Sequence, residues 1–149
     1  MPRSNARSSC GQALIATKVA AAMRFGVLCA LLLAGGLVGT AQAAQHVLWN
    51  QAAFASAQNA GKSIIVHVTA PWCTICAKQK PTIQALESDP KFAEAIVFEV
   101  DFDSQKRVLR QMHVSMQSTL IAFKGKAETA RATGITDPAE IRALFERSL

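Results

Sequence analysis

The most distinct hydrophobic pattern is a pair of apolar runs rich in β-branched residues, SIIVHVTA at 63–70 and IVFEVDFD at 96–103. Such runs are typical of strands that are buried on both faces of a sheet. TLIAFKG at 119–125 predicts a third strand that ends in a turn, and ETARATG at 128–134 predicts a fourth. The chain is therefore expected to build a central sheet of four strands.

Helical patterns fill the intervals between these strands. The alanine-rich segment 50–62 can begin with Asn50 as its N-cap, and Gly61 can end it. Residues 73–87 permit a helix, in which Pro81 predicts a kink because proline lacks the N–H that an α-helix needs.

Three further helices are expected later in the chain. Short helices are predicted over 91–95 and 105–113. An amphipathic helix closes the chain over 137–149, with Asp137 as a cap and Pro138 at the first helical position. This order of strands and helices predicts an α/β fold, in which a mixed sheet is flanked by helices.

The first 43 residues have the pattern of a targeting segment. A basic residue precedes the apolar run FGVLCALLLAGGLVGT, and Ala41-Gln42-Ala43 matches a signal peptidase site. We expect residues 1–43 to be a signal segment, cleaved after about Ala43, that exports the protein to the periplasm. A membrane anchor is the alternative, but about 16 residues are short against the ~20 that span a bilayer. Residues 1–22, before Met23, are interpreted as an extension from an upstream start.

The charge distribution excludes one class of partner. The whole chain has a formal net charge of +6, but four of its 16 basic residues and none of its 10 acidic residues precede residue 25. The remainder has 12 basic and 10 acidic residues, a balance of about +2 without a basic stripe. We therefore expect no nucleic acid partner. The apolar content of 50% is enough to build one core.

Two cysteines carry the candidate chemistry. Cys10 and Cys29 lie in the segment expected to be removed, which leaves Cys73 and Cys76. A strand followed by a helix places Cys73 at the helix N-terminus, where unpaired N–H groups and the macrodipole stabilise a thiolate. Cys76 lies on the same helix face, within the reach of a disulfide. This geometry favours a reversible bridge with Cys73 as the exposed, attacking sulfur and Cys76 as the shielded, resolving one.

Metal binding is the alternative for such a pair. A structural zinc site needs four ligands, and the histidines His46, His67 and His113 are dispersed along the chain. Met112, His113 and Met116 are soft or borderline ligand types, so copper handling stays open beside their simpler role in packing. For the redox function we expect no metal and no cofactor.

The residues around the cysteines resemble a known family. Trp72-Cys73-x-x-Cys76, followed by Lys78 and Pro81, is similar to the active-site motif of thioredoxins. The resemblance implies thiol–disulfide exchange, with Cys73 as the nucleophile and Cys76 as the resolving thiol. It also implies that Trp72 lies at the rim of the active site; packing against the domain is the alternative.

The resemblance extends over the rest of the chain. VFEVDFD is similar to the central strand of thioredoxins, which ends here at Asp103, and STLIAFKGKAE is similar to their later segment of strand and turn. Gly134 falls where the family has a glycine before its last helix. The likeness covers roughly 47–149, so the resemblance implies a thioredoxin-like domain at 44–149 with the thioredoxin fold.

Two departures from the family lie beside the predicted site. His67 stands where thioredoxins have a buried aspartate, and Glu99 stands where they have its lysine partner. His67 is either a hydrogen-bonded core histidine or a proton acceptor for Cys76, since imidazole exchanges protons near neutral pH. Glu99 is either a partner of His67 or an exposed side chain.

A third departure concerns substrate binding. The position of the family's cis-proline is Ser118. A cis peptide before a residue other than proline costs about 3 to 4 kcal/mol, so we expect Gln117-Ser118 to be trans. The resemblance places Gln117, Ser118 and Thr119 with Trp72 in the substrate-binding surface.

The direction of electron flow is predicted from the residues between the cysteines. Thr74-Ile75 supplies neither the histidine of oxidising relatives nor the Gly-Pro of reducing thioredoxins. Without an imidazolium beside the thiolate, the disulfide should not be strongly oxidising. We expect a monomeric reductase that acts on protein disulfides and receives electrons from a membrane thiol reductase. Soft-metal handling and a noncatalytic binding module stay open as alternatives.

Overall fold

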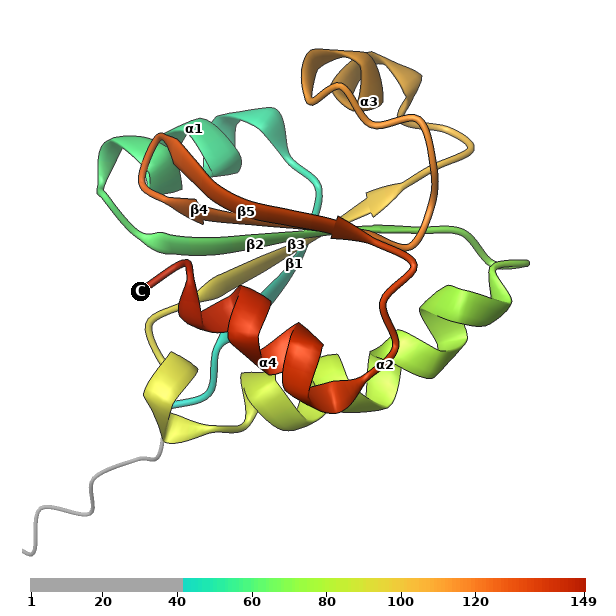
Figure 1. Ribbon diagram of the computed structural model, residues 1–149. Helices are drawn as coiled ribbons and strands as arrows, with labels where there is room; N and C mark the ends of the chain where they lie inside the picture. Colours follow the sequence, from blue (N-terminus) through green and yellow to red (C-terminus); the bar gives the residue numbers. More distant parts are fainter. Residues whose placement is uncertain (1–41) are drawn as a thin grey trace, which may run out of the picture. The chain divides into compact units, whose positions relative to one another are not determined.

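Five strands form one mixed sheet in the order β1-β3-β2-β4-β5 (Figure 1). The computed structural model describes residues 42–149. The predicted extension at 1–22 and the apolar run of the signal segment lie outside the described residues. The strands are β1 (Gln45–Leu48), β2 (Ser63–Thr69), β3 (Ile96–Asp101), β4 (Thr119–Lys124) and β5 (Ala127–Thr133).

Helices cover both faces of this sheet. β1 and β2 run parallel to β3, whereas β4 is antiparallel to both β2 and β5. In Figure 1, α1 and α3 lie on one face, and α2 and α4 lie on the other. The helices are α1 (Gln51–Asn59), α2 (Thr74–Glu87), the 3₁₀ helix η1 (Pro90–Phe92), α3 (Lys106–Gln111) and α4 (Pro138–Glu146).

The thioredoxin fold predicted from the sequence is therefore present, but the sheet has five strands instead of four. The additional strand is β1, which pairs only with β3 at one edge of the sheet. Its four residues, QHVL, are mostly exposed. Such a short edge strand needs no apolar run, so the hydrophobic pattern does not reveal it.

The predicted helix caps are confirmed. The Asn50 side chain accepts the Ala53 N–H at 2.9 Å, and Asp137 accepts the Ala139 N–H at 2.8 Å. These caps satisfy N–H groups that have no partner within the helix. α2 continues through Pro81 to Glu87, so the proline does not end the helix. None of the helices described over 42–149 has the length and apolar composition needed to cross a membrane.

Alternation along β2 divides the core into two layers. Ile64, Val66 and Val68 pack with the aromatic cluster under α1 and α3. Ile65 packs into the layer under α2 and α4, where Phe92 and Phe145 meet edge to face. Since successive side chains of a strand point to opposite faces, His67 is on the same side as Ile65. This places a histidine beneath the helix that begins at the cysteine pair.

Candidate active site

The cysteine pair lies where the chain leaves β2 and enters α2. Cys73 is the N-cap of α2, and its Sγ accepts the Cys76 N–H at 3.0 Å. Cys73 and Cys76 form a disulfide, with their Cα atoms 5.3 Å apart. Since an N–H donor and the positive end of the helix dipole both face Cys73 Sγ, they will stabilise this sulfur as a thiolate after reduction.

The predicted difference in exposure between the two cysteines is absent from the disulfide form. Cys73 is 5% exposed and Cys76 is 3% exposed. Both pack with Ala70, and Ile75 and Phe102 cover this small cluster. In the disulfide form Cys73 therefore belongs to the same buried cluster as Cys76. The prediction of an exposed Cys73 is thus wrong for the oxidised state.

Trp72 lies at the surface directly before the cysteines. It is 57% exposed, and its indole Nε1–H donates to Asp103 Oδ2 at 2.8 Å. The ring is therefore held from the segment after β3 and is not packed in the core. Trp72 and Asp103, which are far apart in the sequence, meet beside the disulfide.

A pocket of about 290 Å³ opens next to the disulfide. It brings His67 together with both cysteines, as the proton-acceptor hypothesis requires. Its charged lining residues come from α2 and β3. These are Lys80, Glu99 and Asp101.

His67 is buried and uncharged at neutral pH. It is 4% exposed, and burial is the main cause that holds its pKa below the ordinary 6.5. Its Nε2 lies 3.2 Å from Oε1 of Gln79, a contact that by itself raises the pKa. The desolvation cost of the imidazolium is larger, so the neutral imidazole is favoured.

Glu99 does not make the direct pair with His67 that the sequence suggested. The two residues are in register on β2 and β3, and the Glu99 charge acts to raise the pKa of His67. Its carboxylate instead lies 3.4 Å from Nε2 of His46 on β1. The Nδ1 of His46 also lies 2.6 Å from Glu87 Oε1, so this imidazole joins β3 to the end of α2. Glu99 is thus half-buried and engaged elsewhere.

Ser118 is fixed next to the disulfide by its backbone. It is 4% exposed and has a φ of +57°, in the left-handed region. Its N–H donates to Val68 O at 2.8 Å, and its carbonyl accepts from Gln79 Nε2 at 3.1 Å and from the Gly134 N–H at 3.0 Å. Cys76 Sγ lies 3.9 Å from the same Val68 oxygen. One carbonyl group therefore separates Ser118 from the resolving cysteine.

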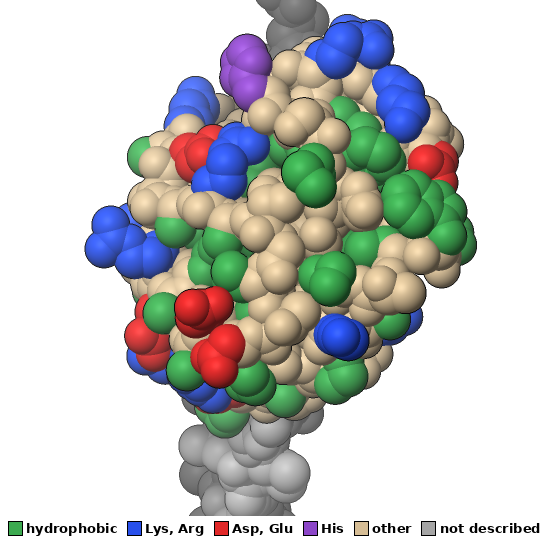
Figure 2. Space-filling view, turned by 45° about the vertical axis from the view of Figure 1, so that its right-hand side comes forward, with side chains coloured by type: hydrophobic (Ala, Val, Ile, Leu, Met, Phe, Trp, Pro, Cys, Tyr) green, Lys and Arg blue, Asp and Glu red, His purple; other side chains and the backbone are tan. Residues whose placement is uncertain are grey.

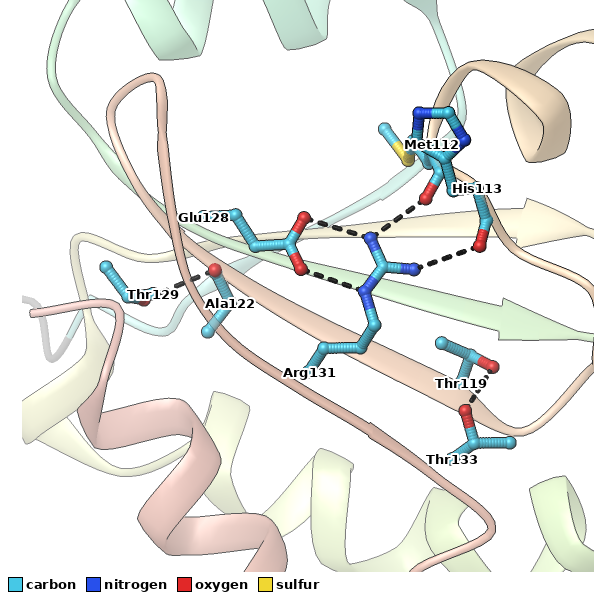
Figure 3. Close-up of polar contacts among 8 residues, drawn as sticks. All are labelled: Met112, His113, Thr119, Ala122, Glu128, Thr129, Arg131 and Thr133. Atoms are coloured by element: carbon cyan, nitrogen blue, oxygen red, sulfur yellow. Dashed lines mark hydrogen bonds and ion pairs between the residues drawn. The ribbon is translucent and has the colours of Figure 1, made fainter.

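The neighbours of Ser118 differ in what they can offer to a substrate. Gln117 is half-buried, so part of its side chain faces solvent. Thr119 is 2% exposed, and its hydroxyl donates to Met116 O at 2.8 Å. The same hydroxyl lies 2.9 Å from Thr133 Oγ1 on β5 (Figure 3). The Thr119 side chain thus joins β4 to β5 and is not free to contact a substrate.

The family model described as Thioredoxin matches residues 45–147, nearly all of the described domain. The chain belongs to the thioredoxin family. Among solved structures it is similar to Trxlp from Edwardsiella tarda, with a TM-score of 0.65 and 37% sequence identity. That match covers 67% of this chain and 98% of the other.

Curated relatives agree with this membership. Thioredoxin H2-2 from rice is 30% identical over 86 residues, 58% of this chain, and the match spans 63% of the rice protein's length. Thioredoxin from Chlamydia trachomatis is 30% identical over 84 residues, 56% of this chain and 80% of that protein. Family membership together with the Cys73–Cys76 disulfide supports thiol–disulfide oxidoreductase activity.

Sequence reasoning missed Gln79, which is completely buried beside this thioredoxin-type disulfide. It lies three residues after Cys76 and shares the buried face of α2 with Ile83 and Leu86. The signal that could have revealed it is a glutamine among the apolar residues on the buried face of a helix, where an amide without hydrogen-bond partners would be costly. That signal becomes visible only when the inward face of the helix is known.

The soft ligand types of the copper alternative do not gather at the thioredoxin-type disulfide. Met112 and His113 line a different pocket, and their carbonyl oxygens accept from Arg131 (Figure 3). Met116 is 54% exposed. Within the described part of the chain, no three His, Cys, Asp or Glu residues are grouped so as to hold a metal ion.

Proposed function

We propose that this thioredoxin-family protein is an exported reductase of protein disulfides. The observation that carries the proposal is the Cys73–Cys76 disulfide at the N-terminus of α2, in a pocket that also contains a neutral, buried imidazole. These parts are sufficient for two successive thiol–disulfide exchanges, one at each cysteine.

The reduced protein acts in two steps. The Cys73 thiolate attacks one sulfur of the substrate disulfide, which forms a mixed disulfide and releases the first substrate thiolate to be protonated. Cys76 then loses its proton to His67 and attacks Cys73 Sγ. The Cys73–Cys76 disulfide closes and the second substrate thiol leaves. Two electrons pass to the substrate, which becomes a dithiol, and the protein is oxidised.

The charges near the disulfide favour the reducing direction. A thiolate that is strongly stabilised makes its disulfide a strong oxidant. The described site supplies one N–H to Cys73 Sγ, and the nearby imidazole of His67 is neutral. The single cation that lines the pocket, Lys80, is outnumbered by Glu99 and Asp101. Beyond that N–H and the helix dipole, the Cys73 thiolate gains little from neighbouring charges, so we expect a dithiol that readily gives up electrons.

The surface around the disulfide suits a polypeptide substrate. Figure 2 shows the side of the molecule on which α2 begins in Figure 1. Uncharged and hydrophobic groups occupy most of the middle of this face, and charged side chains lie mainly at its margin. The exposed ring of Trp72 adds an apolar contact beside the sulfurs. We propose folded or misoxidised proteins as substrates, a membrane thiol reductase as electron donor, and action as a monomer.

The reduction potential of the Cys73–Cys76 pair tests this function. We expect a value of about −270 mV, as for reducing thioredoxins, and catalysed reduction of insulin disulfides in the presence of a dithiol. Cys73→Ser should abolish the activity without unfolding the protein. A potential of about −120 mV would instead identify an oxidant. Export is tested by N-terminal sequencing of protein isolated from the periplasm, whose first residue should be at about Ala44.

A further inference from the structure

The amide of Gln79 connects three separate parts of the fold. Its Nε2 donates to Ser118 O at 3.1 Å, before β4, and to Ile135 O at 2.9 Å, before α4. Its Oε1 lies 3.2 Å from His67 Nε2 on β2. Gln79 is 0% exposed, so water cannot replace any of these partners.

These contacts determine where the proton of His67 resides. Backbone carbonyls can only accept, so both N–H bonds of the Gln79 amide are used by Ser118 and Ile135. The remaining amide oxygen can only accept, and His67 Nε2 must therefore donate to it. A neutral imidazole has a single N–H, so Nδ1 of His67 carries a free lone pair.

The lone pair on Nδ1 belongs to a residue that lines the pocket beside the disulfide. His67 lines it with both cysteines, and no hydrogen bond to its Nδ1 is found among residues 42–149. The titratable groups around the imidazole come from each neighbouring element. They are Lys80 with the two cysteines on α2, Glu99 and Asp101 on β3, and His46 on β1.

We propose that Gln79 is a positioning residue that holds His67 as the Nε2–H tautomer, so that Nδ1 is the atom that accepts the proton of Cys76. The inference rests on the proposed function. As Cys76 Sγ attacks the mixed disulfide, its proton moves to Nδ1 and the imidazole becomes an imidazolium. Gln79 Oε1 still accepts from Nε2 in that state, so the same contact serves both forms. The proton then passes to the departing substrate thiolate.

Two substitutions at Gln79 should shift His67 in opposite directions. Gln79→Met removes the acceptor of Nε2–H, so the fixed tautomer is lost and proton uptake at the imidazole becomes harder. Gln79→Glu keeps an acceptor for Nε2–H and adds a negative charge, so the Nε2–H tautomer stays and proton uptake becomes easier. Like Gln79→Met, it loses the N–H groups that donate to Ser118 O and Ile135 O, so this loss is common to both variants. Leu86→Met, on the same buried face, is the control for altered packing.

Two separate measurements report on the tautomer of His67 and on the attack of Cys76 on the mixed disulfide. Nitrogen-15 NMR of the histidines should show Nε2 protonated and Nδ1 unprotonated in the wild type, and a mixture of tautomers in Gln79→Met. Release of a chromogenic thiol from a mixed disulfide on Cys73, followed from pH 5.5 to 8.5, should slow roughly tenfold at pH 7 in Gln79→Met. In Gln79→Glu its pH profile should move to higher pH.

Two outcomes would overturn the inference. One is a wild type with the proton on Nδ1; the other is a Gln79→Met protein with the wild-type tautomer and release rate. Should neither Gln79 variant fold, the tautomer of His67 in the wild type still tests the inference, because that measurement needs no substitution. The NMR measurement needs no turnover, so a wild type that reduces no disulfide would refute the proposed function while the tautomer is still determined.

Discussion

At the scale of single residues, Ser118 has a backbone conformation that proline cannot adopt. Its φ of +57° lies far from the value near −65° to which the proline ring is restricted. Its N–H donates to Val68 O at 2.8 Å, and proline has no N–H to donate. The family's proline and this serine therefore require different local backbones. That the Gln117-Ser118 peptide is trans stays a prediction.

Ser118→Pro should consequently not convert the protein into a more typical thioredoxin. The excluded φ and the lost hydrogen bond should lower the free energy of unfolding by about 3 kcal/mol or more. Ser118→Gly should be nearly neutral, because relief of the left-handed conformation offsets the larger entropy of glycine in the unfolded chain. Urea unfolding of the oxidised proteins measures both. Equal stability of the proline and wild-type proteins would contradict this account of the loop.

At the scale of elements, α3 is held at its C-terminal end by β5. α3 has only six residues, and Gln105 gives it no side-chain N-cap. Arg131 donates to Met112 O at 2.8 Å and makes two contacts with the Glu128 carboxylate, at 2.8 and 2.9 Å (Figure 3). A cation at this end also complements the helix dipole. Because isolated helices of this length are unstable, the position of α3 depends on such a clamp.

Arg131→Met should therefore loosen α3 more than the rest of the fold. We expect amide hydrogen exchange in α3 and in residues 112–118 to increase about tenfold, with α2 unchanged. Arg142→Met is the matched control, because it also removes an arginine that pairs with a carboxylate, here Asp89 across η1 and α4. If both variants changed α3 equally, the clamp would have no specific role.

At the scale of the whole molecule, acid should destabilise the fold in two ranges of pH. The pKa of His67 is lowered in the folded protein, so below about 6.5 the unfolded chain binds a proton that the folded chain rejects. The free energy of unfolding therefore falls as the pH drops below about 6.5, and His67 causes no such decrease above that pH. Three carboxyl groups also have pKa values below the ordinary ones, so they stabilise the fold at neutral pH. Their contribution to the free energy of unfolding is lost only below about pH 4 to 4.5. They are Asp89, held by the Lys91 N–H and Arg142, Asp101, held by Ser104, and Glu128, held by Arg131.

The first range can be assigned to one residue. Between pH 6.5 and 5 the free energy of unfolding of the wild type should fall with a slope of up to about 1.4 kcal/mol per pH unit. His67→Gln should remove this slope whatever its effect on stability at pH 7.5. His113→Gln, which removes an exposed imidazole, should keep the slope. Denaturant titrations at each pH measure it, and an unchanged slope in His67→Gln would refute the assignment.

The fold was largely predictable because most of its strands are marked by local runs of apolar residues. The buried runs of β2 and β3 and the capping residues Asn50 and Asp137 act locally, so the sequence shows them. β1 could not be found in this way, since an exposed edge strand is defined by its pairing with β3.

The site was predictable in its chemistry but not in its contacts. Cys73, Cys76 and His67 follow from motif and position, and the structure gathers them at one pocket. Gln79 was missed because its partners lie 12, 39 and 56 residues away in the chain. The burial of Cys73 was likewise missed, because it involves packing against Phe102, which is distant in the chain.

The position of β1 has a consequence for the proposed cleavage of a signal segment. The strand begins at Gln45, and the N–H of Ala44 already donates to Glu87 O at 2.8 Å, at the end of α2. Cleavage after Ala43 would turn that amide nitrogen into an ammonium group, placed at the negative end of a helix dipole. Cleavage a few residues later would delete β1 and leave β3 as an apolar edge open to another chain. If the segment is cleaved as proposed, the exact cleavage position would thus decide between a protected sheet edge and one that can pair with another chain.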